Sequence, residues 1–287
     1  MLLQCQVGVK MAARTLDFNK IREIAHKGVI RSAAFLGLGV NASRDPEFKK
    51  YQLTDITMFR VIPDSVSDAD VTHFKEEFEK WVIVNGLRGL VESFAIFLDK
   101  IHIACLMMAV SKNVYSPEEA KRFEVAFERK GIEQKLLTLG NRFEIGTEKE
   151  TYLISINRAR NCITHRNGHV GPEDAGDDGV FRLKWWALDV YVETSTGEIH
   201  SLTPPYPEEG LFLKDGGPVK IKVMDRELEY PLGQYIHLTP NELSEICLLF
   251  QLSTDEVVKS AIEYAKGVGI EVNNETPTPS DSTSNGE

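Results

Sequence analysis

Apolar residues recur at helical spacing through the middle of the chain. After Asp68 and Asp70 a long stripe repeats every three or four positions. Its members are Leu87, Leu90, Phe94, Leu98, Ile101, Cys105 and Met108. Residues at this spacing share one face of an α-helix. We therefore predict a long helix whose apolar face is either core or a dimer interface.

Three shorter helices are predicted before residue 168. The sequence Ser-Pro-Glu-Glu at 116–119 has a capping serine, a proline suited to the first turn and a glutamate that can return a capping-box bond. This helix should run to about residue 130. Two more are expected over 132–139 and from about 147 to 167, because a glycine follows each of them.

After residue 179 the pattern changes to alternation with a period of two. Phe181, Leu183 and Trp185 alternate with Arg182 and Lys184, which is typical of a half-buried strand. Further strand sequence is expected at 186–192, from Ile199 after a turn at 195–197, at 219–223 and at 228–230. The chain therefore predicts a β-rich insertion at about 179–230.

A final helix is predicted from the Thr239-Pro240 cap, with an apolar face that extends to Ile262. No large apolar residue follows Asn273, so the tail 273–287 is expected to be disordered. The predicted domain thus covers 66–272. It is mainly α, and α+β overall because of the insertion before the closing helix.

The first 65 residues form an N-terminal region to which the sequence assigns no fold. A helix is expected from 16 to 30, and Gly37 and Gly39 should break the helical pattern. A polar loop over 41–50 and a strand over 51–62 are expected to follow.

Composition limits the class of protein. With 43 acidic and 33 basic residues the net charge is −10, which argues against an overall basic coat for nucleic acid. Four scattered cysteines without a CxxC pair suggest neither a disulfide scaffold nor a zinc ribbon. The N-terminus lacks a signal-peptide pattern, and the apolar stretch 81–110 carries four charges. We expect a soluble, cytoplasmic protein without a membrane span.

One segment differs from this acidic background. The stretch 151–170 contains three arginines and two histidines but no acidic residue. The five are Arg158, Arg160, His165, Arg166 and His169. An arginine fork can hold phosphate oxygens in two hydrogen bonds, and histidine transfers protons near neutral pH. This combination suits a phosphodiester substrate.

The spacing inside this segment restricts its geometry. Asn161 and His165 are four apart and share a face if the helix persists. Arg160 and His165 are five apart, so at about 100° per residue they point roughly 140° from each other. Either the helix ends near His165, or a second copy of the chain completes the site across a dimer.

The sequence Arg-Asn-Cys-Ile-Thr-His at 160–165 resembles the Arg-x(4–6)-His motif of HEPN domains, in the form Arg-Asn-x-x-x-His. The Arg-Asn-Gly that follows, and the motif's place on the last helix of an apolar bundle, are also similar to HEPN proteins. The resemblance covers about 66–170 and the closing helix. It implies a HEPN-like bundle that acts as a homodimeric, metal-independent endoribonuclease and leaves 2′,3′-cyclic phosphate ends. Toxin–antitoxin and antiphage-defence systems use such domains, which implies RNA and an antitoxin or defence-system protein as partners.

The resemblance also implies roles for single residues. His165 would be the general acid or base at the ribose 2′-hydroxyl or the leaving 5′-oxygen. Arg160 would stabilise the charge of the phosphorane-like transition state, and Asn161 would orient His165 or the phosphate. Auxiliary RNA contacts would come from Arg158, Arg166 and His169. Neither a metal nor a cofactor is implied.

Other interpretations remain open at this stage. Arg160 and His165 could simply stabilise a helix end through backbone carbonyls and the helix dipole. A non-catalytic HEPN-like interaction or nucleotide-binding module is the alternative function. We expect Trp185 and Trp186 to pack the sheet rather than to stack on bases.

Three ligand sites also have to be considered. Cys162, His165 and His169 are residue types that bind zinc, although they supply only three ligands. The acidic residues at 173–178 could hold a hard cation but lack the spacing of an EF-hand, so we expect a solvated loop. Residues 37–42 fit G-x-G-x-x-A, but no clear strand precedes them, as a dinucleotide site would require.

Overall fold

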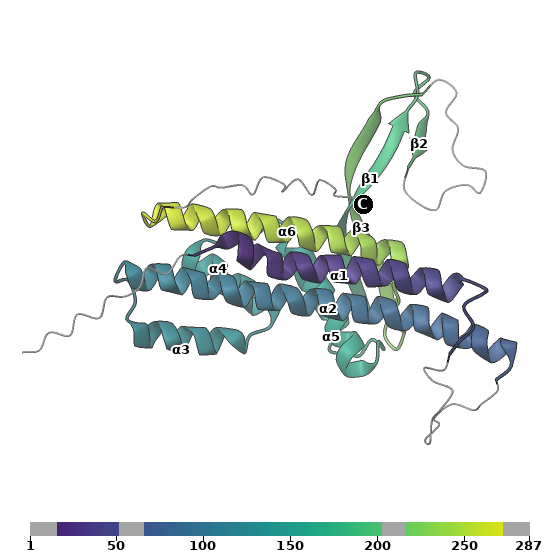
Figure 1. Cartoon of the computed structure of the whole chain (residues 1–287), viewed down its shortest axis with the longest axis horizontal. Helices are drawn as coiled ribbons and strands as arrows, with labels where there is room; N and C mark the ends of the chain where they lie inside the picture. Colours follow the sequence, from purple (N-terminus) through teal and green to yellow (C-terminus); the bar gives the residue numbers. More distant parts are fainter. Residues whose placement is uncertain (1–15, 52–65, 203–215, 272–287) are drawn as a thin grey trace, which may run out of the picture.

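The computed structural model describes residues 16–51, 66–202 and 216–271. Its helices are α1 (Phe18–Arg44), α2 (Asp68–Ser111), α3 (Pro117–Glu128), α4 (Ile132–Phe143), α5 (Glu150–Arg166) and α6 (Pro240–Gly267), and its strands are β1 (Val180–Glu193), β2 (Ile199–Ser201) and β3 (Val219–Pro231). The described part is mainly helical, with one antiparallel sheet of order β2-β1-β3 (Figure 1). This confirms a mainly α fold with a β-rich insertion before the last helix.

The long helices α1, α2 and α6 lie side by side, and each of them contacts the other two (Figure 1). The predicted stripe of α2 is core, because Leu87, Leu98, Ile101 and Cys105 are completely buried. Among the described residues α2 is the one helix long and apolar enough to span a membrane, and 61% of its most apolar window is buried inside the fold. Such burial fits the core helix of a soluble protein.

The expected break of α1 at Gly37 and Gly39 is wrong, because the helix continues to Arg44. The reason is close helix packing. A Cβ added to Gly39 would lie 2.6 Å from a methyl of Val82 on α2, and one added to Gly28 would lie 2.3 Å from Cβ of Ser93. Glycine therefore lets α1 approach α2 closely.

Residues 18–44 of the unassigned N-terminal region thus belong to the helical core. The loop expected over 41–50 begins only after α1 ends. The expected strand over 51–62 and the expected disorder of 273–287 fall, apart from Tyr51, outside the described residues.

The helix starts predicted from the caps at Ser116 and Thr239 are confirmed, and each cap forms a complete capping box. Ser67 caps α2 in the same way. In contrast, the helix expected to stop before Gly140 continues through it to Phe143. A glycine inside a helix costs only about 1 kcal/mol, which the packing of Leu136, Leu139 and Phe143 in the core can offset.

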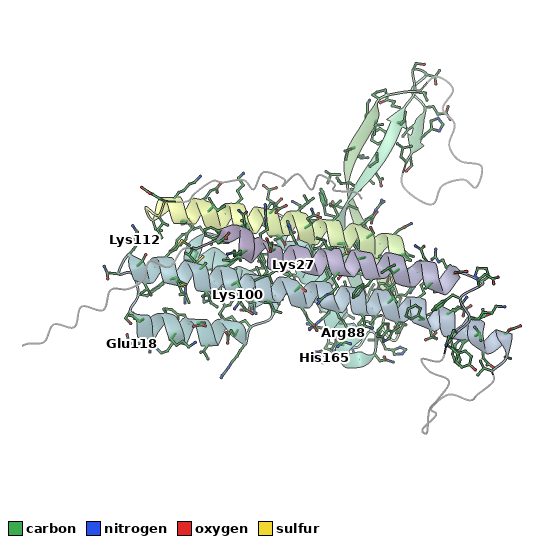
Figure 2. The ribbon with its side chains drawn as sticks, viewed as in Figure 1. Lys27, Arg88, Lys100, Lys112, Glu118 and His165 are labelled. Atoms are coloured by element: carbon green, nitrogen blue, oxygen red, sulfur yellow. The ribbon has the colours of Figure 1, made fainter. Side chains whose placement is uncertain are left out.

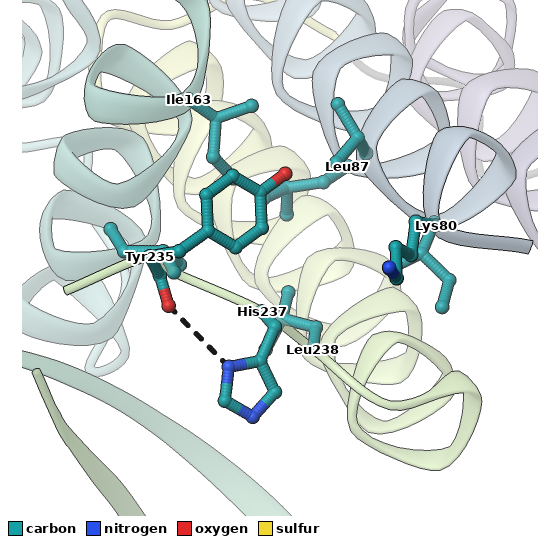
Figure 3. A pocket seen from close by; sticks show the side chains of 9 residues that line it. Lys80, Leu87, Ile163, Tyr235, His237 and Leu238 are labelled. Atoms are coloured by element: carbon teal, nitrogen blue, oxygen red, sulfur yellow. Dashed lines mark hydrogen bonds between the residues drawn. The ribbon is translucent and has the colours of Figure 1, made fainter. Parts of the chain in front are cut away.

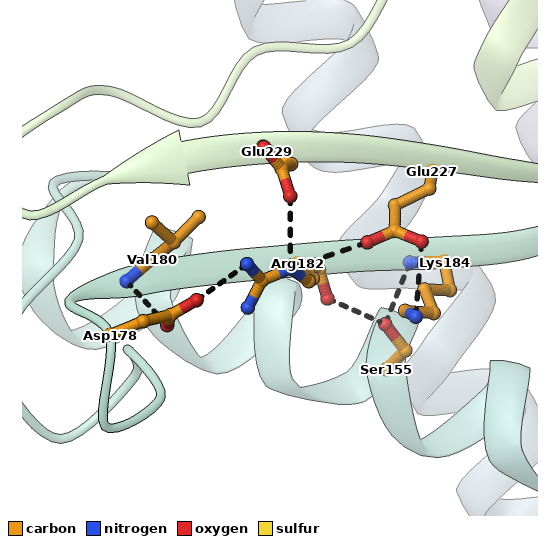
Figure 4. A network of polar contacts seen from close by, with 7 residues as sticks. All are labelled: Ser155, Asp178, Val180, Arg182, Lys184, Glu227 and Glu229. Carbon is orange, nitrogen blue, oxygen red and sulfur yellow. Dashed lines mark hydrogen bonds and ion pairs between the residues drawn. The ribbon is translucent and has the colours of Figure 1, made fainter.

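The two short strands predicted at 219–223 and 228–230 are one strand, β3, which pairs with β1 over the length of both strands. Charged cross-strand contacts stabilise the pairing of the polar stretch between the two predicted strands. Arg182 of β1 is 2.9 Å from Glu229 and 3.4 Å from Glu227 (Figure 4). The Ser155 hydroxyl of α5 donates to the carbonyl of Arg182 and accepts from the amide of Lys184. These two hydrogen bonds join α5 to the side of β1 that faces away from β3.

The base of the sheet packs into the bundle, while its far end projects away from it (Figure 1). At the base, Phe181, Leu183 and Trp185 are buried, and the Trp185 indole donates to Glu245 of α6 at 2.7 Å. The prediction that Trp185 packs the sheet is confirmed. Trp186 is half-buried beneath Lys149, whose Nζ lies 5.4 Å from the ring centroid.

His102 is a buried titratable group in the core of α2. Its ring stacks on Phe127 at 3.8 Å between centroids, and neither ring nitrogen has a hydrogen-bond partner in the described part of the chain. Burial, together with the positive charges of Arg142, Lys130 and Lys135, lowers the pKa of His102 to about 4.

Acid is therefore expected to destabilise the fold through His102. Because the folded-state pKa lies below the unfolded value of 6.5, stability is complete above pH 6.5 and falls as the pH drops toward 4. The free energy of unfolding should be lower than at pH 7 by about 2 kcal/mol at pH 5 and by about 3 kcal/mol at pH 4. Urea unfolding from pH 7 to pH 4 measures it. His102→Phe should flatten this profile, whereas the exposed control His73→Ala should leave it unchanged. Parallel profiles for His102→Phe and the unaltered chain would contradict the assignment.

Candidate functional site

The basic segment predicted from sequence forms the C-terminal half of α5 and the turn after it. α5 ends at Arg166, and Asn167 and Gly168 follow with φ of 53° and 82°. Their amides both bond to the carbonyl of Cys162, which satisfies an end group of the helix. The helix thus persists one residue beyond His165, and the angular separation of roughly 140° from Arg160 applies.

Both the backbone conformation and the packing at position 168 require glycine. Its φ is +82°, and a Cβ here would lie 2.5 Å from the ring of Tyr235. That ring packs edge-on against the ring of His169 at 5.5 Å between centroids. The glycine therefore fixes the turn that follows the motif.

We expect Gly168→Ala to lower the free energy of unfolding by about 2–3 kcal/mol, from left-handed strain plus the displaced Tyr235 ring. Gly233→Ala is the matched control, because Gly233 has the same φ of +82° and nothing within 4 Å of an added Cβ. The control should lose only about 1–2 kcal/mol. Urea titration of both variants checks this, and equal losses would refute a packing role for Gly168.

Arg160 points from α5 toward α2. One guanidinium nitrogen lies 3.3 Å from the Glu92 carboxylate, and another donates to the side-chain oxygen of Asn161 at 3.1 Å. Its Nε is buried without a partner in the described residues. Asn161 therefore orients Arg160 in this structure, and no contact joins it to His165 in the described part of the chain.

His165 lies on the outward face of α5 and is exposed. Spacings of four place Asn157, Asn161 and His165 along this same face. His165 has no hydrogen-bond or ion-pair partner among the residues described. Its ring is therefore available to solvent and to a substrate.

Two α2 residues join this site that the sequence interpretation missed. Glu92 pairs with Arg160, and Arg88 lies one helical turn before Glu92. Arg88 Nε is buried and unpartnered within the described ranges. Figure 2 labels Arg88 and His165, which come from α2 and from the end of α5. Only helix packing brings residues 68 positions apart together, so no local sequence signal indicated them.

The three residues expected to assist RNA binding differ in availability. Arg158 is exposed and only loosely paired with Glu133 at 3.9 Å. Arg166 is held by Asp174 and by Glu173, the latter at 3.0 Å. His169 is exposed beside Tyr235. Arg158 and His169 can reach a ligand directly, whereas a ligand would have to displace carboxylates from Arg166.

The contacts of Cys162 do not match a zinc site. Its buried thiol donates to the carbonyl of His169 at 3.2 Å, and burial foremost, with Asp174, raises its pKa to about 11. The acidic loop is also engaged, since Asp174 binds Arg166 and Asp178 binds Arg182. Within the described ranges no group of three His, Cys, Asp or Glu side chains is arranged to hold a metal ion.

Residues 37–42 do not form a nucleotide-binding loop, in agreement with the absence of a preceding strand signal. These residues form continuous helix within α1, and Gly39 packs against Val82. A phosphate-binding loop requires backbone amides free of helical bonds at a turn.

A small apolar pocket lies between α2, the end of α5 and the turn before α6 (Figure 3). It is lined by Leu87 and Ile163 at its floor and by Lys80, Tyr235 and His237 at its rim. Its volume of about 30 Å³ suits one water rather than a nucleotide. This pocket is therefore not a binding site for a nucleotide.

Several large apolar residues of α1 and α2 are exposed. Phe78 and Trp81 of α2 stack with ring centroids 6.3 Å apart, and Trp81 is 62% exposed. Phe35 and Leu38 of α1 are also exposed, and they lie at the same level because Gly39 packs on Val82. Helical spacing places Trp81 and Glu92, the partner of Arg160, on one face of α2, with the polar residues Asn85 and Arg88 between them. Exposed aromatic and aliphatic side chains next to polar residues are typical of a protein interface.

Comparisons with protein-family models, with curated proteins and with solved structures each find no match to this chain.

Proposed function

We propose that this protein is a metal-independent endoribonuclease of HEPN type. The observation that carries the proposal is the arrangement of the motif at the end of α5: Arg160 is bonded to Asn161, and His165 is exposed on the face that it shares with Asn161. The helical bundle around the motif supports it. The biological setting we propose is a cytoplasmic toxin or antiphage-defence effector, controlled by an antitoxin or a defence-system protein.

The chemistry needs no metal because the nucleophile belongs to the substrate. The ribose 2′-hydroxyl attacks the phosphorus, its proton passes to a histidine, and the bond to the 5′-oxygen breaks as that oxygen takes a proton. The products are a 2′,3′-cyclic phosphate and a free 5′-hydroxyl. His165 would perform these proton transfers, and Arg160 would stabilise the charge that builds on the phosphoryl oxygens.

A homodimer follows from the angle between the two side chains. Since Arg160 and His165 diverge by roughly 140°, one chain does not direct both at one phosphate. A second copy would supply the complementary group. The exposed residues Phe35, Leu38, Phe78 and Trp81 support such an assembly, because Trp81 shares a face of α2 with Glu92, the partner of Arg160.

The alternative is a non-catalytic interaction or nucleotide-binding module. The carboxylates that hold the arginines favour it, because Glu92 pairs with Arg160 and Asp174 with Arg166. Growth of cells that overexpress the chain separates the two functions. A nuclease should arrest growth in a manner relieved by His165→Ala, whereas a binding module should give the same growth with either chain.

The direct test is incubation of the purified protein with single-stranded RNA in excess chelator. We expect cleavage with 2′,3′-cyclic phosphate ends, detected by mass spectrometry of the fragments. Cleavage that stops in chelator, or fragments with 3′-hydroxyl ends, would contradict the proposal. So would RNA that stays intact at protein concentrations where sedimentation shows a dimer.

A further inference from the structure

The far end of the sheet is a ribbon that projects from the bundle (Figure 1). We define this distal ribbon as residues 188–193 of β1, strand β2 and residues 219–223 of β3. On β3, Val219, Ile221 and Val223 are 63%, 65% and 56% exposed. The register places Leu188, Val190 and Val192 of β1 beside them on the same face. The exposed part of this apolar face is therefore the β3 edge, because Val192 is buried and Leu188 and Val190 are half-buried.

β3 is an edge strand, and its outward backbone groups can be identified. The carbonyl of Val190 accepts from Leu202 on the β2 side, so the backbone groups of Val190 point away from β3. The carbonyl of Arg182 and the amide of Lys184, which bind Ser155, point the same way. Because Ile221 is the register partner of Val190, its own N–H and C=O point outward. By alternation, those of Val219 and Val223 do as well.

On the opposite face the two β3 side chains are lysines, while Asp189, Tyr191 and Glu193 of β1 lie on the inner side of the same face. Lys220 is exposed and pairs with Glu193, and Lys222 is exposed without a charged partner among the residues described. Over five residues the edge therefore offers outward hydrogen-bonding groups, three exposed apolar side chains and two exposed lysines, of which Lys220 is paired with Glu193.

We propose that the β3 edge of the distal ribbon binds an extended segment of a partner protein in which apolar and acidic residues alternate. The segment would add a strand next to β3 and bond to the backbone of Val219, Ile221 and Val223. Its apolar side chains would cover those three residues, and its carboxylates would face Lys220 and Lys222. This inference goes beyond the proposed ribonuclease activity, in which the ribbon takes no part.

A second copy of the chain fits this edge less well. A symmetric pair must be antiparallel, and any register that matches the apolar faces sets lysine opposite lysine. Like charges directly opposite on paired strands are destabilising. Charge complementarity therefore selects an acidic partner rather than self-association.

The probe is a labelled seven-residue peptide in which glutamate alternates with valine and isoleucine, measured by fluorescence anisotropy on the full chain. We expect it to bind, and we expect the same peptide with lysine in place of glutamate to bind at least about tenfold more weakly. Ile221→Pro removes an outward N–H without touching the β1–β3 ladder, and should weaken binding by about tenfold or more. Lys222→Glu should weaken binding by a similar factor. The dissociation constant of this variant should also rise less with added salt than that of the unaltered chain.

Ile199→Pro is the matched control, since Ile199 is equally exposed on the other edge and opposes Glu193. It should leave binding unchanged, and melting curves of all variants establish that they fold. Equal binding of the two peptides, no binding of the acidic peptide, or equal effects of the two proline variants would overturn the proposal. A dimer of the unaltered chain that Ile221→Pro dissociates would also overturn it, in favour of a second copy.

Discussion

The His165→Ala variant is expected to cleave RNA about 10²–10⁴-fold more slowly than the unaltered chain, the usual contribution of a positioned acid or base. The physical reason is the loss of the proton acceptor for the 2′-hydroxyl. His165 is exposed and unpartnered within the described residues, so its removal should leave the melting temperature unchanged. Single-turnover cleavage of labelled RNA measures the rate apart from product release.

The matched control is His73→Ala, which removes an exposed histidine near the N-terminus of α2. It should cleave at the unaltered rate. Arg160→Ala should also lose activity, because Arg160 would stabilise the transition state, while Glu92→Gln should retain it and bind RNA more tightly once the competing carboxylate is neutral. Equal cleavage by His165→Ala, Arg160→Ala and the unaltered protein would exclude the motif as the catalytic centre.

The sequence predicts those parts of this site that are local. The basic segment, the helix that carries it and the turn at Gly168 all follow from residues close together in the chain. The contact between Arg160 and Glu92 does not, because helix packing alone brings α2 to α5. The same distinction explains α1, where Gly39 looks like a helix breaker until Val82 of α2 is placed against it.

The sheet shows a related difference. The alternation from Phe181 to Trp185 predicts a strand with one buried face, and the structure has it. The polar stretch of β3 carries little strand signal of its own. It pairs because Glu227 and Glu229 meet Arg182, and because Arg226 meets Asp189 of β1 at 2.5 Å. Cross-strand charge pairing depends on register, which sequence alone leaves open.

The largest loss of stability is expected where a charge is buried. Lys135 of α4 is almost fully buried, and its Nζ lies 2.6 Å from the Asp99 carboxylate of α2. Burial raises the pKa of Asp99, while the ammonium of Lys135 opposes that shift. Without the carboxylate, Lys135 keeps only the Ala95 carbonyl at 3.5 Å and the Phe127 ring, whose centroid is 5.5 Å away. Asp99→Ala should therefore cost about 3–5 kcal/mol of unfolding free energy, the usual penalty for an unpaired buried charge.

Two further variants separate this penalty from simple loss of contacts. Glu133→Ala breaks an exposed pair with Arg158 and should change stability by less than about 0.5 kcal/mol. The double variant Asp99→Leu with Lys135→Met removes both charges and fills the space, so it should recover most of the stability lost in Asp99→Ala. Urea unfolding at pH 7 compares the four chains. If the double variant were as unstable as Asp99→Ala, the loss would come from packing between α2 and α4 rather than from the unpaired ammonium. Recovery would instead identify the unpaired ammonium as the cause of the loss, and would show that apolar side chains of similar size can replace the ion pair.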